Sequence, residues 1–143
     1  MPKTHTEREP IDVGSMVPSL EDLDKFIARV RALEGPVKRT GEQLDLAVDA
    51  ADALGINLNM GIAGPFVDAL KGDLNGAETL RKIICPERAI RVSQYEEYRV
   101  ELQDNCSATS VVSGRHRIES IARALAVLDH VRDRVIWLRD HRR

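Results

Sequence analysis

Few residues in this sequence have types and spacing that could support chemistry, and the clearest of them is a thiol. Cys85 directly precedes Pro86, so it could be the N-cap of a following helix, where the helix dipole would lower the pKa of the thiol and favour the thiolate. Such a cysteine would suit a small thiol enzyme or a redox sensor. The apolar run Ile83-Ile84 before it instead favours an inert, buried thiol, because free cysteines are frequently core residues.

A second candidate is a pair of arginines that could bind an anion. Arg115 and Arg117 flank His116 just after Ser113-Gly114, at the predicted start of a long helix. Free amide groups at a helix N-terminus, together with two guanidinium groups, would bind a phosphate or the carboxylates of a partner. The alternative is that these side chains only project into water, as surface charges commonly do.

Motifs of known catalytic and metal sites are missing from the sequence. It contains no Gly-x-Ser-x-Gly elbow, no phosphate-binding loop, no Gly-x-Gly-x-x-Gly and no paired Cys-x-x-Cys. His130 and Asp133 stand one helical turn apart, but a metal would need further ligands from another element, and charge pairs with neighbouring arginines explain them better. We therefore expect no catalytic residues, no metal and no cofactor.

The composition predicts one folded domain with a strongly charged surface. The chain has 143 residues, of which 43% are hydrophobic and 31% charged, which suits a single globular domain better than a disordered chain. No run approaches the ~18 apolar residues of a membrane span, and the polar start lacks the apolar stretch of a secretory signal. We expect a cytoplasmic protein, or one incorporated into a particle assembled there, with no membrane partner.

The charge is distributed unevenly along the chain. The formal net charge is -2 and only 3% of the residues are aromatic, so the sequence offers neither an overall attraction to nucleic acid nor many stacking platforms for single strands. The segment 113–143, however, has eight arginines against four acidic residues. This polarity favours a homo-oligomer or a protein complex and makes nucleic acid the less expected partner.

Apolar periodicity and capping residues predict four short helices in the first part of the chain. Residues 1–18 are polar and contain three prolines, which indicates an extended arm. In the helix that follows, the hydroxyl of Ser19 is expected to form a cap with Asp22. Capping residues or proline start the four helices, and glycine or a Cys-Pro pair ends them: they start near Ser19, Thr40, Pro65 and Asn75 and end near Gly35, Gly55, Gly72 and Cys85.

Two periodicities compete between residues 87 and 112. Ile90, Tyr98, Val100 and Leu102 stand in stretches where apolar and polar residues alternate, as they do in strands. Ile90, Tyr98 and Leu102 also fit one helical face, Glu, Arg and Gln favour a helix, and an isolated hairpin is marginal in water. We predict a helix here, with a small β-hairpin within 88–102 as the alternative.

The most regular pattern lies in the last segment of the chain. From residue 113 to about 140, apolar residues recur every three or four positions, which predicts a helix of about 27 residues, roughly 40 Å long. The stripe consists of Ile118, Ile121, Leu125, Leu128, Val131, Val135 and Leu138. Such a helix exceeds a compact core of this size, so part of its stripe is expected to need a partner; the alternative is a long core helix wrapped by the shorter ones.

The sequence therefore predicts an all-α fold, with one domain over 19–143 in which several short helices pack on a long C-terminal helix at about 113–140. The leading hypothesis is a structural or adaptor protein, not an enzyme, that acts by helix-mediated self-association or as a subunit of a larger assembly of the virion or secretion-apparatus type. The expected contact residues are Leu128, Val135, Trp137, Leu138, Arg139 and Arg142. The alternatives are a DNA-associated regulator that binds phosphates through Arg115, Arg117, Arg123 and the terminal arginines, and a thiol enzyme or redox sensor at Cys85.

Overall fold

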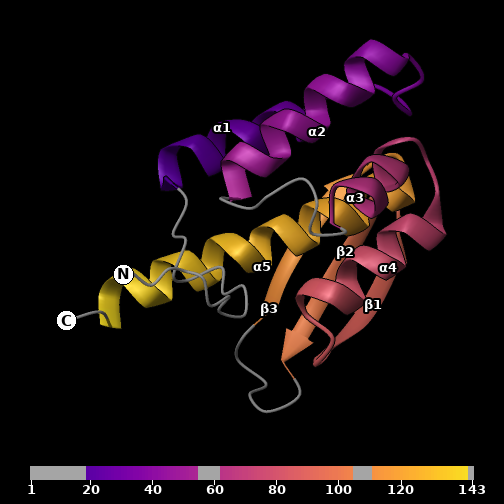
Figure 1. The fold of residues 1–143 in the computed structure, drawn as a ribbon. Coiled ribbons are helices and arrows are strands. Elements are labelled where there is room, and N and C mark those ends of the chain that lie inside the picture. Colours follow the sequence, from indigo (N-terminus) through magenta and orange to yellow (C-terminus); the bar gives the residue numbers. More distant parts are fainter. Residues whose placement is uncertain (1–18, 55–61, 105–110, 142–143) are drawn as a thin grey trace, which may run out of the picture.

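The computed structural model describes residues 19–54, 62–104 and 111–141, and in these ranges it has five helices and three strands (Figure 1). In chain order they are α1 (Leu20–Arg31), α2 (Thr40–Leu54), α3 (Ala63–Leu70), α4 (Leu74–Ile84), β1 (Arg88–Gln94), β2 (Tyr98–Asp104), β3 (Val111–His116) and α5 (Glu119–His141). The expected arm over residues 1–18 and the expected contact residue Arg142 lie outside the described residues.

The prediction of an all-α fold is wrong, because the three strands form an antiparallel sheet in the order β1-β2-β3. Leu102 in β2 lies opposite Ile90 in β1 and opposite Val112 in β3. The hairpin that the sequence offered as the alternative corresponds to β1 and β2, and β3 replaces the expected start of the long helix. This segment forms strands and not a helix because Val100, Leu102 and Val112 are buried in the core. The hairpin is therefore packed against other elements, whereas an isolated hairpin would be marginal in water.

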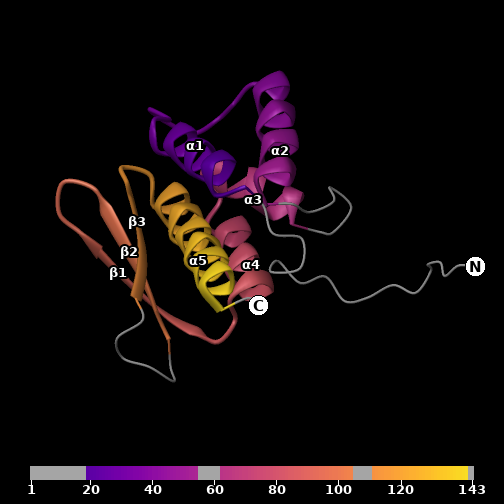
Figure 2. The same cartoon turned by 90° about the vertical axis from the view of Figure 1, so that its left-hand side faces the viewer.

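The molecule has a sheet layer and a helical layer, which Figure 2 shows side by side. α5 packs on β3 and β2, and its other sides contact α1, α3 and α4, while α2 lies against α1 and α3. No described element covers the outer face of the sheet, on which Arg91, Arg99 and Arg115 are exposed. The fold therefore leaves one polar sheet surface open to solvent or to a partner.

The long helix begins at Glu119, not near residue 113, and Gly114 in β3 lies directly against it. A Cβ atom on Gly114 would lie 2.3 Å from the carbonyl oxygen of Ala122 and 2.4 Å from the amide nitrogen of Ala126. Both alanines are fully buried. Small residues on both elements thus allow strand and helix backbones to approach closely.

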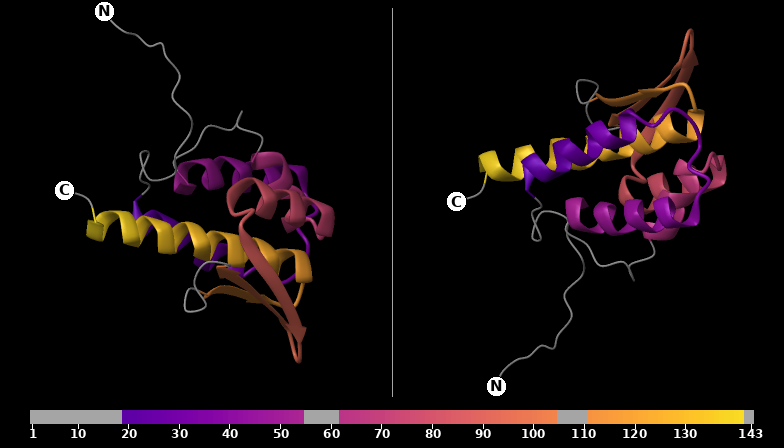
Figure 3. Two further views of the ribbon diagram at one scale, coloured as in Figure 1. Left: turned by 90° about the horizontal axis from the view of Figure 1, so that it is seen from below. Right: turned by 90° about the horizontal axis from the view of Figure 1, so that it is seen from above.

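α5 is covered by its own chain over most of its length. Leu128, Val131 and Val135 are at most 1% exposed, and α1 packs beside α5 (Figure 3). The Arg132 guanidinium donates a hydrogen bond to Asp24 Oδ1 at 2.6 Å, and this bond raises the pKa of Arg132. The apolar stripe is thus largely core, as in the wrapped-helix alternative. Within the described ranges, no helix combines the length and apolar character needed to cross a membrane.

Local signals set most of the helix boundaries. The Asp22 N–H donates to Ser19 Oγ at 3.3 Å, so Ser19 caps α1 as predicted. α4 begins after Asp73, whose carboxylate accepts from the Asn75 N–H at 2.9 Å; Asp73, and not Asn75, is therefore its cap. Gly72 follows α3 with φ of 104°, a left-handed conformation that glycine adopts without strain.

Candidate functional site

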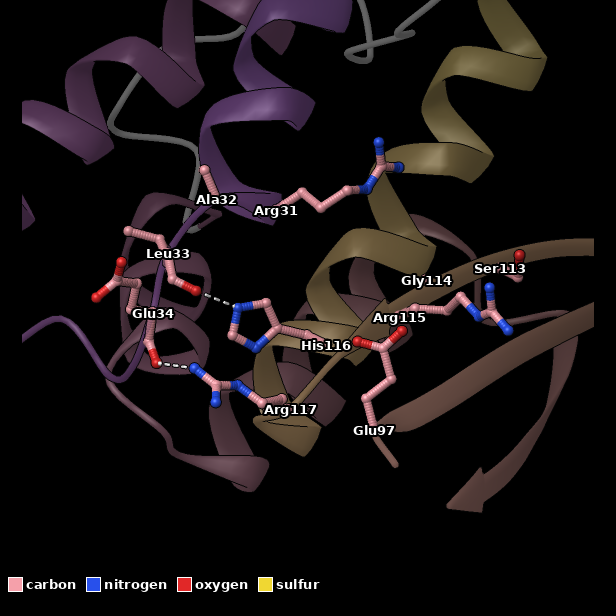
Figure 4. Close-up of a pocket in the computed structure, with 10 residues that line it drawn as sticks. All are labelled: Arg31, Ala32, Leu33, Glu34, Glu97, Ser113, Gly114, Arg115, His116 and Arg117. Atoms are coloured by element: carbon pink, nitrogen blue, oxygen red, sulfur yellow. Dashed lines mark hydrogen bonds between the residues drawn. The ribbon is translucent and has the colours of Figure 1, made fainter. Parts of the chain in front are cut away.

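Four arginines from different elements line two adjacent hollows at one corner of the sheet, and we call this set the basic corner: Arg31 in α1, Arg99 in β2, Arg115 in β3, and Arg117 between β3 and α5. The first hollow, of about 610 Å³, lies between the end of α1 and β3, and the second, of about 490 Å³, lies beside the β1–β2 turn. Both hollows share Arg115, Arg117 and Glu97 in their lining. Figure 4 shows the residues around the first hollow.

Arg99 and Arg115 lie directly opposite each other on the outer face of the sheet. The Ser113 N–H donates to Asp129 Oδ2 at 3.0 Å, so it points away from β2, and Ser113 belongs to a non-hydrogen-bonded pair. This pattern repeats every two residues, so Arg99 and Arg115 also form a non-hydrogen-bonded pair, in which opposing side chains are closest. Like charges that face each other across strands destabilise a sheet.

The arginines of the basic corner are unequally neutralised. Arg99 lies 3.3 Å from Glu101 Oε2. Among the described residues, Arg117 donates only to the main-chain carbonyl of Glu34, at 3.3 Å. Among the described carboxylates, none lies within 4.0 Å of the guanidinium nitrogens of Arg115. Arg115 therefore has an exposed positive charge beside the guanidinium of Arg99, which Glu101 neutralises in part.

His116 connects the segments that carry the basic corner. Its side chain is buried, and its Nδ1 accepts a hydrogen bond from the Ile118 N–H at 3.0 Å, so Nε2 carries the proton. Nε2 donates to the Leu33 carbonyl oxygen at 2.6 Å (Figure 4). The ring thus ties the junction of β3 and α5 to the segment after α1. Spacing alone could not reveal this role, because Leu33 is remote from His116 in the sequence.

The predicted anion-binding pair, Arg115 and Arg117, does line a hollow, although not at a helix N-terminus as expected. Arg115 lies in β3, two residues before Arg117 in the connection to α5. Arg99 and Arg31 were not predicted, because their approach depends on strand register and on the packing of α1. The first hollow also contains Glu34 and Glu97, so its charge is mixed.

The other predicted contact residues do not form one surface. Leu128 and Val135 are 1% and 0% exposed and belong to the core, so neither is open to a partner in this fold. Trp137 is 52% exposed, Leu138 is half-buried and Arg139 is exposed. Arg123, expected to meet phosphates, instead lies 2.7 Å from a carboxylate oxygen of Glu119 and 3.6 Å from one of Glu78.

Cys85 is the C-cap of α4 and not the N-cap of a helix, because β1 follows it. The side chain is completely buried. Burial, with a smaller contribution from the nearby carboxylate of Glu87, raises the pKa of the thiol to about 11. At neutral pH the group is therefore a thiol and not a nucleophilic thiolate.

We expect Cys85 to resist thiol reagents in the folded protein. The variant Cys106→Ser leaves it as the one thiol of the chain. At neutral pH a chromogenic disulfide reagent should modify this variant at least about a hundredfold more slowly than the same variant unfolded in guanidinium, because only the unfolded state exposes the sulfur and restores its ordinary pKa. Equal rates with and without denaturant would show that Cys85 is accessible in the native state.

His130 is partly buried and has an unmatched polar atom. Its Nδ1 is inaccessible to solvent and has no hydrogen-bond partner within the described part of the chain. Burial, and then the positive charge of Arg88, lowers the pKa of His130 from its ordinary 6.5. No group of three or more possible metal ligands occurs among the described residues, so His130 and Asp133 gain no further ligands there.

The lowered pKa of His130 predicts a pH dependence of stability. Below about pH 6.5 His130 binds a proton in the unfolded chain more readily than in the folded protein, because folding lowers its pKa. The free energy of unfolding should therefore fall with decreasing pH, by up to about 1.4 kcal/mol per pH unit from this group. Above that range the contribution is constant. Urea unfolding between about pH 5 and pH 8 should show this extra slope in the wild type and not in His130→Gln. Parallel curves for both proteins would contradict the prediction.

The arginines of the basic corner suit the binding of anions better than acid–base catalysis. Guanidinium groups bind carboxylates and phosphates in a fixed geometry, but they do not exchange protons at neutral pH. Comparisons of the chain with protein-family models, with curated proteins and with solved structures find no match. The geometry of the basic corner is therefore the main basis for a functional proposal.

Proposed function

We propose that the protein is a non-catalytic adaptor or assembly component, and that it recruits an acidic partner through the basic corner. The observation that carries the proposal is the close cross-strand pair Arg99 and Arg115, which has Arg117 beside it and two hollows for a ligand. An arrangement that violates the local charge rules of a sheet is typical of a functional site. The carboxylates of a partner would remove the repulsion between the two guanidinium groups and form charge-assisted hydrogen bonds with them.

This proposal keeps the adaptor role but moves it from the helix to the sheet. A helical seam through Leu128 and Val135 would need those side chains to leave the core, at a cost of several kcal/mol. Trp137 and Arg139 at the end of α5 remain candidates for a second contact, because both are exposed. A thiol-based activity is not proposed, since Cys85 is buried with a raised pKa.

A charge-reversal pair tests the proposal. We expect Arg115→Glu/Arg117→Glu to weaken binding of a short fluorescent peptide that alternates Glu and Thr by more than about tenfold at low salt, because two charge-assisted contacts become repulsive. The control Lys25→Glu/Lys38→Glu makes the same change in net charge at two exposed lysines outside the hollows and should bind as the wild type does. Added salt should weaken wild-type binding.

Two results would reject the proposal. Equal loss in both double variants would mean that only net charge matters, and no binding of the Glu-Thr peptide by the wild type would mean that the basic corner does not attract acidic peptides. Circular dichroism of each variant verifies that it is folded before its affinity is compared.

A further inference from the structure

The first hollow gives a ligand access to the main chain of β3 as well as to arginine side chains. β3 is an edge strand, and the Ser113 N–H points to its free edge, where it donates to Asp129. Because backbone groups alternate along a strand, the N–H and C=O of Arg115 point to the same free edge. That edge faces residues 31–34 across the hollow.

We propose that an acidic segment of a partner protein binds in this hollow as a short additional strand beside β3. Its main chain would pair with Arg115, and the side chains on the outer face would be acidic and meet Arg115, Arg99 and Arg117. This inference rests on the proposed function and specifies its partner. Peptides often bind to proteins by such strand addition, in which main-chain hydrogen bonds give affinity and alternate side chains give specificity.

Asp129 limits the length of this additional strand. Its carboxylate already accepts the Ser113 N–H at 3.0 Å, so a peptide cannot pair with that amide without displacing Asp129. The strand addition is therefore centred on Arg115, and the affinity must come largely from the acidic side chains. This favours a short acidic motif over a long apolar strand.

The mixed charge of the hollow favours a peptide over a single-stranded nucleic acid. Glu34 and Glu97 line the first hollow together with its arginines and would repel a continuous run of phosphates, whereas a peptide can place uncharged residues beside them. The C=O of Arg115 also needs a donor, which a peptide amide supplies and a phosphodiester does not. Tyr95, which is 93% exposed, is the one aromatic ring among the described residues that line the second hollow and offers little stacking surface.

Alternate N-methylation of a peptide tests for strand addition. The probe is a short fluorescent peptide that alternates Glu and Thr, and its anisotropy is measured with the full-length protein. In one analogue the Glu amides are methylated and in the other the Thr amides. Strand addition uses only alternate amides, so one analogue should lose about tenfold in affinity and the other should bind as the unmodified peptide does. Equal affinities of both analogues, or equal losses in both, would overturn the inference.

Two further measurements separate this inference from the proposed function. If a thymidine oligonucleotide of the same length binds more tightly than the peptide, and Arg115→Glu/Arg117→Glu abolishes its binding, the basic corner is a nucleic-acid site and the peptide inference is wrong. If the double variant binds the unmodified peptide as the wild type does, the basic corner is not the contact and the proposed function fails as well. If the wild type binds one methylated analogue more tightly than the other and the double variant does not, the result supports both the strand addition and the proposed function.

Discussion

Replacement of Gly114 by alanine is expected to lower the free energy of unfolding by about 3 kcal/mol or more, and it is the most damaging single change that we foresee. The new methyl group would lie 2.3 Å from the Ala122 carbonyl oxygen, 2.4 Å from the Ala126 amide nitrogen and 2.7 Å from Leu125 Cβ. Two of these atoms belong to the backbone of α5, which no side-chain rotation can move. The helix must therefore shift away from the sheet and loosen the core that both elements share.

Urea unfolding followed by far-ultraviolet circular dichroism measures this effect. The matched control is Gly35→Ala, because a Cβ atom at Gly35 meets nothing within 4 Å, and it should change stability by less than about 1 kcal/mol. If Gly114→Ala unfolds at the same urea concentration as the wild type, α5 does not lie on β3 at this position. If the variant does not fold, Gly114→Ser should be equally poor, because the Cβ atom itself is the obstacle.

The second large effect is expected at Gly76, within α4. Alanine in a helix is usually more stabilising than glycine, by up to about 1 kcal/mol. A Cβ atom on Gly76, however, would lie 2.5 Å from Asp68 Cβ and 2.9 Å from the Pro65 carbonyl oxygen in α3. We therefore expect Gly76→Ala to destabilise the protein by about 2 kcal/mol, because α3 and α4 must separate.

Gly41→Ala is the matched control for Gly76→Ala, because Gly41 is a helical glycine at which an added Cβ atom would meet nothing within 4 Å. It should stabilise the protein, by up to about 1 kcal/mol. Opposite signs for the two substitutions, measured by thermal unfolding, would confirm that α3 and α4 are in close contact. A gain in stability in both variants would show that they are not.

Several helix ends were predictable from the sequence because local chemistry sets them, but the start of α5 was not. Ser19 caps α1 through the Asp22 N–H, and Gly72 follows α3 with the positive φ that glycine permits. The hairpin was ranked below a helix for the opposite reason. Ile90 and Leu102 fit a helical face as well as a strand face, and only the packing of β2 and β3 against α5, which brings distant segments together, decides between the two.

The candidate site was predictable only in part. Arg115 and Arg117 stand out because they are close together in the sequence, so their grouping requires no knowledge of the fold. The position of Arg99 opposite Arg115 depends on the register of β2 and β3, which local patterns leave open. The burial of Leu128 and Val135 likewise depends on the other elements that cover α5, and an apolar stripe does not reveal whether its cover comes from the same chain.

The contact between α1 and α5 has a consequence for the order of events during synthesis. Asp24 and Arg132 are separated by 108 residues, and Leu33 and His116 by 83, so α1 is synthesised well before α5, and the side of α1 that packs on α5 stays uncovered until α5 is made. Closing such long loops slows folding. Until then the nascent chain exposes Leu23, Ile27 and Val30, and it is during this interval, more than in the finished molecule, that a chaperone would find a binding site.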